Sequence, residues 1–141
     1  MDGDRPSSAH RSPHAAAPGD LDVTVGQHAT RVVVTARGEL DLNTVAHLEA
    51  AVADHAGPRQ DLVVDLGELT FVDSTGLRLL LRLRERAQRN ATGLLVVTSE
   101  RVRRILDLSG MAALFDCVDR PPLHAPPTAV PTERAPDGQP A

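Results

Sequence analysis

The segment Leu69–Leu77 reads Leu-Thr-Phe-Val-Asp-Ser-Thr-Gly-Leu and marks the point where an apolar stretch turns into a helix. An acid and two hydroxyl residues stand at this junction, as is typical of residues that cap a helix N-terminus. We expect Asp73 or Ser74 to lie near the N-cap, with the free backbone N–H groups of Thr75, Gly76 and Leu77 pointing outward. A helix N-terminus favours negative charge, so a phosphate on Ser74 would meet donors there. Plain capping is the alternative explanation of the same residues.

The helix that begins here is predicted to run from about Ser74 to Asn90. Gly76 in its first turn would let another backbone approach closely, because glycine has no side chain. Charged residues recur at helical spacing along one continuous face, namely Arg78, Arg82, Glu85, Arg86 and Arg89. This face is net basic on a chain whose formal net charge is −4. Either it is a solvated helix face, or it docks on an acidic patch of a partner beside Ser74.

Outward from this segment, the chain alternates short strand and helix patterns. Strands are expected at residues 21–26, 31–38, 61–66 and 93–98, with a last short strand at 115–118. Besides the helix at 74–90, one helix is expected after a cap at Asn43 or Thr44, ending at Gly57-Pro58, and another after a cap at Ser99, ending at Gly110. This order predicts an α/β fold: a mixed β-sheet with helices packed mainly on one face.

The two ends of the chain differ in composition from the middle. Ten of the eleven prolines lie in residues 1–20 and 121–141, and only Pro58 lies elsewhere. Few apolar side chains in these ends could offset the entropy of ordering. We therefore expect a disordered tail at 1–20, a single domain at 21–120 and a disordered, proline-rich tail at 121–141.

Composition also narrows the classes of function. The acidic net charge and the two phenylalanines, with no Trp or Tyr, argue against a direct nucleic-acid partner. No apolar run is long enough to span a bilayer and no signal region is visible, so we expect a cytoplasmic protein without a membrane partner. Cys117 lies among apolar residues and is expected to be a core thiol. His47 and His55 stand too far apart to share a metal ion, and we expect neither a metal nor a cofactor.

Three segments together resemble the STAS domain family, and within it the bacterial anti-sigma factor antagonists, also called anti-anti-sigma factors. Phe71–Leu77 resembles the phosphorylation motif of these antagonists. Gly38–Asp41 is similar to their loop between the second strand and the first helix, and Leu106–Met111 with Leu114 and Phe115 resembles their later helix and its return to the last strand. The likeness covers about residues 20–120. Arg78 departs from it, since several relatives carry a glycine there.

The resemblance implies a regulator rather than an enzyme, working by partner switching. The unphosphorylated antagonist would bind an anti-sigma factor that is a serine kinase, and so release the sigma factor and regulate transcription. Phosphorylation of Ser74 would end the binding, and a serine phosphatase would restore it. The residues expected to contact the partner are Glu39, Asp41, Asp73, Thr75, Gly76, Arg78 and Arg82.

Two other functions fit parts of the pattern. Ser74 could be an enzyme nucleophile, but the segment is not a Gly-x-Ser-x-Gly elbow and no histidine is placed near it by any predicted element. Alternatively, the domain could be a STAS regulatory subunit of a transport or signalling complex. The intact Asp-Ser-Thr-Gly segment favours the phosphorylation switch.

Overall fold

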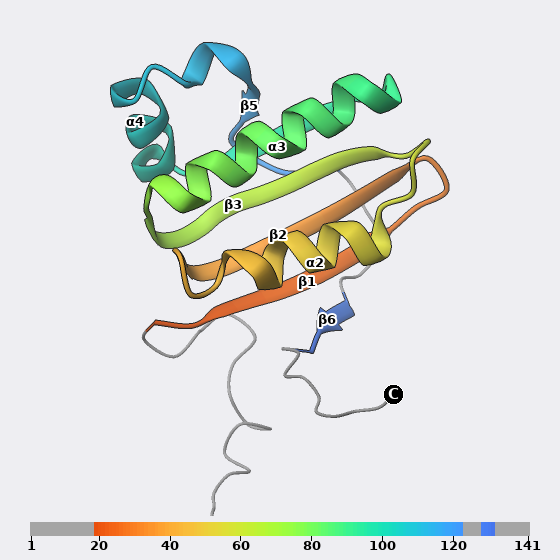
Figure 1. Cartoon of the computed structure of the whole chain (residues 1–141), viewed down its shortest axis with the longest axis horizontal. Coiled ribbons are helices and arrows are strands. Elements are labelled where there is room, and N and C mark those ends of the chain that lie inside the picture. Colours follow the sequence, from red (N-terminus) through yellow and green to blue (C-terminus); the bar gives the residue numbers. More distant parts are fainter. Residues whose placement is uncertain (1–18, 123–127, 132–141) are drawn as a thin grey trace, which may run out of the picture.

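The computed structural model of the chain describes residues 19–122 and 128–131 (Figure 1). The strands are β1 (Leu21–Gln27), β2 (Arg31–Leu40), β3 (Asp61–Val72), β4 (Leu94–Thr98), β5 (Asp116–Val118) and β6 (Thr128–Val130). The α-helices are α2 (Val45–His55), α3 (Ser74–Asn90) and α4 (Glu100–Leu108), and a short 3₁₀ helix, η1, spans Ala112–Leu114.

The strands form one mixed sheet in the order β5-β4-β3-β2-β1-β6. The strands β2, β3, β4 and β5 are parallel, whereas β1 pairs antiparallel with both β2 and β6. Helix α2 packs on β1 and β2, while α3 and α4 pack on β3 and β4 (Figure 1). Each parallel connection passes over the sheet through a helix, which confirms the predicted α/β architecture.

The core lies between the sheet and these helices. Strand residues alternate between the two faces, so Val32, Val34 and Ala36 of β2 belong to the main core, while Val33 points to the other side. There Val33 packs with Val63 and Val97 in a small separate cluster, to which no helix of the described residues contributes. The helices therefore cover one face of the sheet, as predicted.

Strand β3 is longer than the sequence pattern predicts, ending at Val72 rather than Leu66. The register between β2 and β3 shifts twice, between Thr35 and Arg37 and again between Gly38 and Glu39. Each shift places an additional β3 residue opposite β2, as in a β-bulge. Because a bulge breaks the alternation of buried and exposed residues, the end of this strand does not have the two-residue period expected of a strand.

A strand within the expected C-terminal tail also departs from the prediction. Thr128–Val130 pairs with Val23–Val25 of β1 and occupies the edge of the sheet. The expectation of disorder is wrong for these residues, because the unpaired backbone groups of an edge strand bind even a short extended segment. The remainder of this tail beyond Pro131, and residues 1–18, lie outside the described residues.

Candidate functional site

The carboxyl ends of the parallel strands bring two predicted segments together at one edge of the sheet. The connection that follows β2 and the start of α3, which follows β3, lie side by side there (Figure 1). A backbone hydrogen bond joins them: the Asp73 amide donates to the Leu40 carbonyl over 3.1 Å. The segments Gly38–Asp41 and Phe71–Leu77 thus form one continuous surface.

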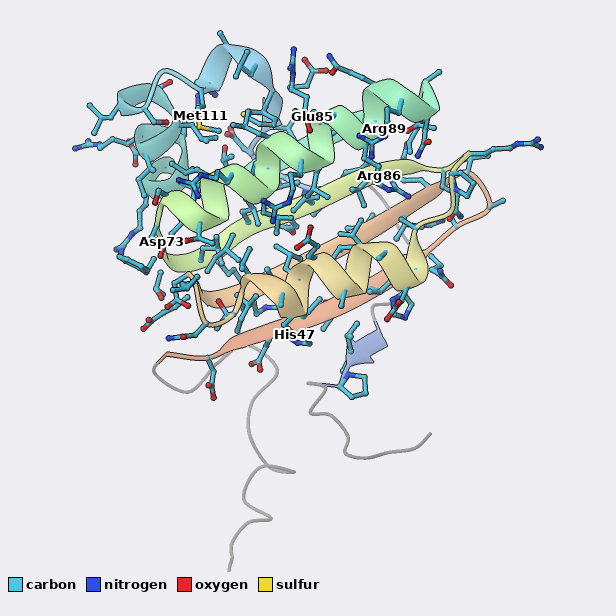
Figure 2. All side chains as sticks on the ribbon, in the orientation of Figure 1. His47, Asp73, Glu85, Arg86, Arg89 and Met111 are labelled. Carbon is cyan, nitrogen blue, oxygen red and sulfur yellow. The ribbon has the colours of Figure 1, made fainter. Side chains whose placement is uncertain are left out.

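Asp73 is the N-cap of α3 (Figure 2). Its Oδ1 atom accepts hydrogen bonds from the amides of Thr75, at 2.9 Å, and Gly76, at 3.1 Å. The Leu77 amide donates to the Asp73 carbonyl. The expectation that these three amides are free is therefore wrong, because the aspartate side chain and backbone already satisfy them. Ser74 is the first helical residue, and it is exposed to solvent.

Gly76 is buried, and the position that a side chain would occupy on it faces the protein's own core. A Cβ atom built on it would lie 2.7 Å from Cγ2 of Val72 and 2.8 Å from Cγ of Leu40. The sequence suggested that Gly76 lets another backbone approach closely. The structure instead fills that space with two side chains of the same fold, so Gly76 allows α3 to pack closely on β2 and β3.

Glu39, near the end of β2, and Asp41, directly after it, take part in hydrogen bonds that hold the connection after β2 in shape. Thr44 donates its hydroxyl to the Glu39 carbonyl at 2.7 Å and accepts the Asp41 amide at 3.0 Å. Asp41 Oδ1 accepts the amide of Asn43, and Glu39 Oε2 accepts that of Gly19. Both acids are half-buried, so each presents only part of its carboxylate to a partner.

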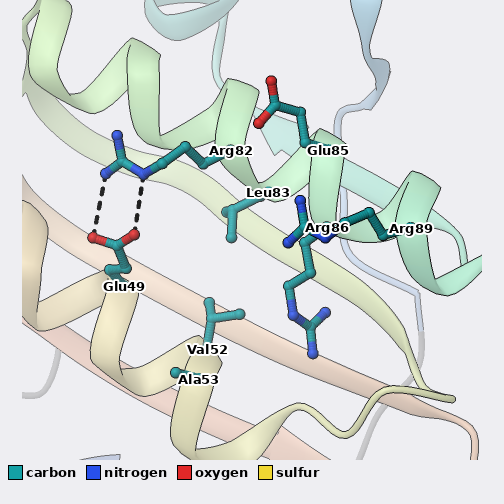
Figure 3. Close-up of a pocket in the computed structure, with 8 residues that line it drawn as sticks. All are labelled: Glu49, Val52, Ala53, Arg82, Leu83, Glu85, Arg86 and Arg89. Atoms are coloured by element: carbon teal, nitrogen blue, oxygen red, sulfur yellow. Dashed lines mark hydrogen bonds and ion pairs between the residues drawn. The ribbon is translucent and has the colours of Figure 1, made fainter.

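The basic face of α3 is only partly free. Arg82 forms a bidentate ion pair with Glu49 of α2, at 3.1 and 3.2 Å (Figure 3). Arg86 donates hydrogen bonds to the carbonyls of Ala56 and Gly57. These contacts fasten α3 to α2. Glu49, Arg82 and Arg86 also line a groove of about 230 Å³, together with Arg89. Arg78 is exposed and lies one helical turn beyond Ser74.

Two exposed apolar side chains at this edge were given no role by the sequence reasoning. Leu42, in the connection after β2, is 73% exposed, and Phe71, near the end of β3, is 48% exposed. Large apolar side chains at such exposure next to a polar site are typical of interaction surfaces. The available signal was the isolated leucine between Asp41 and Asn43, in a segment that is otherwise polar.

A cation lies close to the same edge. Arg101, in the first turn of α4, donates to the carbonyl of Thr70 at 3.0 Å. Since Thr70 precedes Phe71 in β3, this contact holds the start of α4 beside the exposed phenylalanine. Arg78 on α3 and Arg101 beside the end of β3 thus add positive charge at this edge, where Asp73 supplies a negative charge.

Three further possible functional features are metal ligands, membrane-spanning helices and the single cysteine. Among residues 19–122 and 128–131, no group of three or more His, Cys, Asp or Glu side chains could hold a metal ion. None of the helices in the described part of the chain has the length and apolar character needed to cross a bilayer. Cys117 in β5 is half-buried and packs against the main core, as predicted for a structural thiol.

Comparisons with known proteins place this geometry in a family. The chain is 32% identical over 100 residues to the anti-sigma-F factor antagonist RsfB of Mycobacterium tuberculosis, covering 70% of this chain and 82% of that one. It is 30% identical over 98 residues to the anti-sigma-B factor antagonist of Staphylococcus epidermidis, covering 68% and 91%.

Solved structures of anti-sigma factor antagonists have a similar fold. An anti-sigma factor antagonist from Mycobacterium paratuberculosis superposes with a TM-score of 0.64 at 32% identity, covering 75% of this chain and 92% of that one. The antagonist SpoIIAA in its unphosphorylated form shares the fold, with a TM-score of 0.58 at 21% identity over 68% and 87% of the two chains. The STAS domain model matches residues 21–124, and the chain therefore belongs to the STAS domain family.

Proposed function

We propose that the chain is an anti-sigma factor antagonist whose binding to its anti-sigma factor is switched off by phosphorylation of Ser74. Relatives at about 30% identity carry the name of anti-sigma factor antagonist. The observation that carries the proposal is an exposed serine hydroxyl at the first position of α3, beside an aspartate that already occupies the helix-end amides.

In the unmodified state, Leu42 and Phe71 provide the apolar part of the contact, and the neutral, exposed Ser74 hydroxyl belongs to the same segment as Phe71. Burying such side chains contributes about 25 cal/mol per Å² of apolar surface removed from water. Arg78 and Arg101 add positive charge at the rim, where it influences the association rate more than the affinity.

Phosphorylation changes the electrostatics of this surface. A phosphate adds about −1.5 to −2 charge. Because Asp73 holds the Thr75 and Gly76 amides, the added charge faces a carboxylate instead of free donors. A like-charge pair 4 Å apart is unfavourable by about 1 kcal/mol in water and by roughly 4 kcal/mol at the lower effective dielectric of a protein surface. Docking a partner removes water from around the pair and so increases the repulsion, and each added increment of about 1.4 kcal/mol corresponds to about tenfold weaker binding.

The kinase in this scheme is the anti-sigma factor itself, which transfers the terminal phosphoryl group of ATP to the Ser74 oxygen. A serine phosphatase hydrolyses the phosphate ester and restores the binding form. The chain acts as substrate and partner in both steps. Intact-mass and fragment-ion spectrometry, after incubation with ATP and a candidate anti-sigma kinase, tests whether the phosphate is added and whether it lies on Ser74.

Binding to that kinase tests the switch itself. The Ser74→Ala variant is expected to bind as the unmodified chain does, whereas Ser74→Asp is expected to bind far more weakly. Gln88→Glu is a matched control, because it adds one negative charge to the same helix about 21 Å from Ser74. Equal affinities for Ser74→Asp and the unmodified chain would exclude the switch, while a failure of every form to bind would exclude the partner.

The apolar contact needs its own test. Leu42→Ser and Phe71→Ser should each weaken binding of the unphosphorylated chain, since both side chains are already exposed in the free protein and their loss should leave the fold intact. Leu108→Ser is the control, because Leu108 is 82% exposed at the other end of α4. Equal weakening by all three variants would show that the effect is not specific to this edge.

A further inference from the structure

Arg78 is the positive group that stands closest to Ser74 along α3. It is the only lysine or arginine among residues 74–81, about the first two turns of the helix. It follows Ser74 by four residues, and both side chains are exposed, so the two lie on one side of the helix. Because the Cα–Cβ bonds of a helix tilt toward its N-terminus, a long side chain at position 78 can extend back toward position 74.

Two other arginines near this edge are already engaged. Arg82 pairs with Glu49 at 3.1 Å, and Arg101 donates to the Thr70 carbonyl at 3.0 Å. Arg78, by contrast, makes no hydrogen bond or ion pair with any residue in the ranges 19–122 and 128–131. Its guanidinium therefore has no contact to give up in that part of the protein when it binds a new anion.

The helix end itself has little to offer such an anion. Asp73 Oδ1 already accepts two amides of the first turn, and its carboxylate adds negative charge directly before Ser74. Two further acids, Glu39 and Asp41, belong to the segment that the Asp73 amide joins through the Leu40 carbonyl. A side-chain cation, rather than the backbone, therefore has to balance the charge of a phosphate on Ser74.

We propose that Arg78 binds the phosphate of phosphorylated Ser74 through its guanidinium and holds it against the first turn of α3. This inference rests on the function proposed above and adds what happens to the phosphate once it is attached. Guanidinium and phosphate groups form paired N–H···O bonds, and an acid four residues before a base is the favourable order on a helix.

The pair gives phosphorylation a second effect on the partner. In the unmodified chain the Arg78 guanidinium is exposed and open to the partner. In the phosphorylated chain the same guanidinium is engaged by the phosphate. Phosphorylation therefore adds negative charge to this edge and also withdraws a positive group from it.

The ionisation of the phosphate tests the pair. Phosphoserine is placed at position 74 of the full chain during synthesis, so no kinase is needed, and ³¹P nuclear magnetic resonance follows its titration. The second pKa of phosphoserine is about 6. A guanidinium favours the dianion, so Arg78→Ala should raise this pKa, by about half a unit in about 0.1 M salt. Asp73, Glu39 and Asp41 act in the opposite direction, but both chains contain them, so the difference isolates Arg78.

Two further variants make the result specific. Arg78→Lys keeps the charge, so its phosphate pKa should stay close to that of the unmodified sequence. Arg89→Ala removes an exposed arginine about 22 Å from Ser74 on the same helix, well beyond the screening length of about 10 Å, and should leave the phosphate pKa unchanged. A phosphate pKa that Arg78→Ala does not change, or that Arg89→Ala raises equally, would overturn the proposal.

These outcomes are separate from those of the proposed function. If no anti-sigma kinase phosphorylates Ser74, the function proposed above fails, but the titration of the synthetic phosphoserine keeps its result. If Arg78→Ala leaves the phosphate pKa unchanged, the pair fails, but the affinities of Ser74→Asp and the unmodified chain still decide the switch.

Discussion

Replacing Gly76 by alanine sets two opposing effects on stability against each other. Alanine is favoured over glycine inside a helix by about 0.8–1.0 kcal/mol, so at an ordinary helical position the change stabilises the protein. At Gly76 the new Cβ would stand 2.7 Å from Val72 Cγ2 and 2.8 Å from Leu40 Cγ. Carbon atoms in contact prefer about 3.5–4.0 Å, so the neighbours must move.

The surroundings determine which effect is larger. Leu40 is completely buried and Val72 is 8% exposed, so neither side chain can turn into solvent to make room. Forcing an extra carbon into a packed core typically costs about 1–3 kcal/mol. The net result is a loss of up to about 2 kcal/mol in the free energy of unfolding after the helix propensity is subtracted. For a domain of this size, each kcal/mol lowers the melting temperature by about 4–8 °C.

Urea denaturation followed by far-ultraviolet circular dichroism measures this change, because the chain has no Trp or Tyr for intrinsic fluorescence. Gly93→Ala is the control, since its Cβ would make an ordinary contact with Asp61 Oδ1 at 3.4 Å. That variant should stay within about 0.5 kcal/mol of the unmodified chain.

A double-mutant cycle with Val72→Ala separates the close contact from general effects. Removing the Val72 methyl groups relieves the shortest contact, so Gly76→Ala should be less harmful in that background, with a coupling free energy of about 0.5–3 kcal/mol. A rise in the urea midpoint of the single variant by the full helix-propensity value would refute the reasoning. So would the absence of any coupling with Val72.

Three further predictions follow from the caps, the surface ion pair and the thiol. Asp73→Ala removes a side chain that accepts hydrogen bonds from two amides, and it should lower the free energy of unfolding by about 1–2 kcal/mol. Ser99→Ala should cost less, because the Ser99 hydroxyl accepts only one amide; a larger loss for Ser99→Ala in urea denaturation would contradict this. Arg82→Ala breaks an exposed ion pair with Glu49 and should cost at most about 1 kcal/mol, less in 1 M salt; a loss that is larger and independent of salt would point to packing instead. Burial raises the pKa of the Cys117 thiol, so this thiol should react slowly with a disulfide reagent at neutral pH and faster in urea; equal reaction rates of the native and unfolded chains would count against this. The free energy of unfolding should also fall as the pH rises into the alkaline range, because the thiol of the unfolded chain ionises first.

The order of elements and the limits of α3 could be predicted from local chemistry alone. Ser74–Asn90 was predicted from its cap and its apolar spacing, and the structure has these bounds. Ser99 was predicted as the next cap, and its side chain accepts the Val102 amide. Such features depend on residues a few positions apart, so the sequence contains all that is needed to recognise them.

The features that the sequence missed arise from residues distant along the chain. Strand β3 continues to Val72 because its bulged end still pairs with β2, and Thr128–Val130 becomes a strand because β1 offers an unpaired edge. The sequence itself determined the pattern of strands and helices, their caps and the exposed serine at the start of α3, since local spacing and backbone chemistry decide these. Only the tertiary structure decided that Gly76 lies against Leu40 and that Arg82 pairs with Glu49, because each of these contacts forms when folding brings separate elements together.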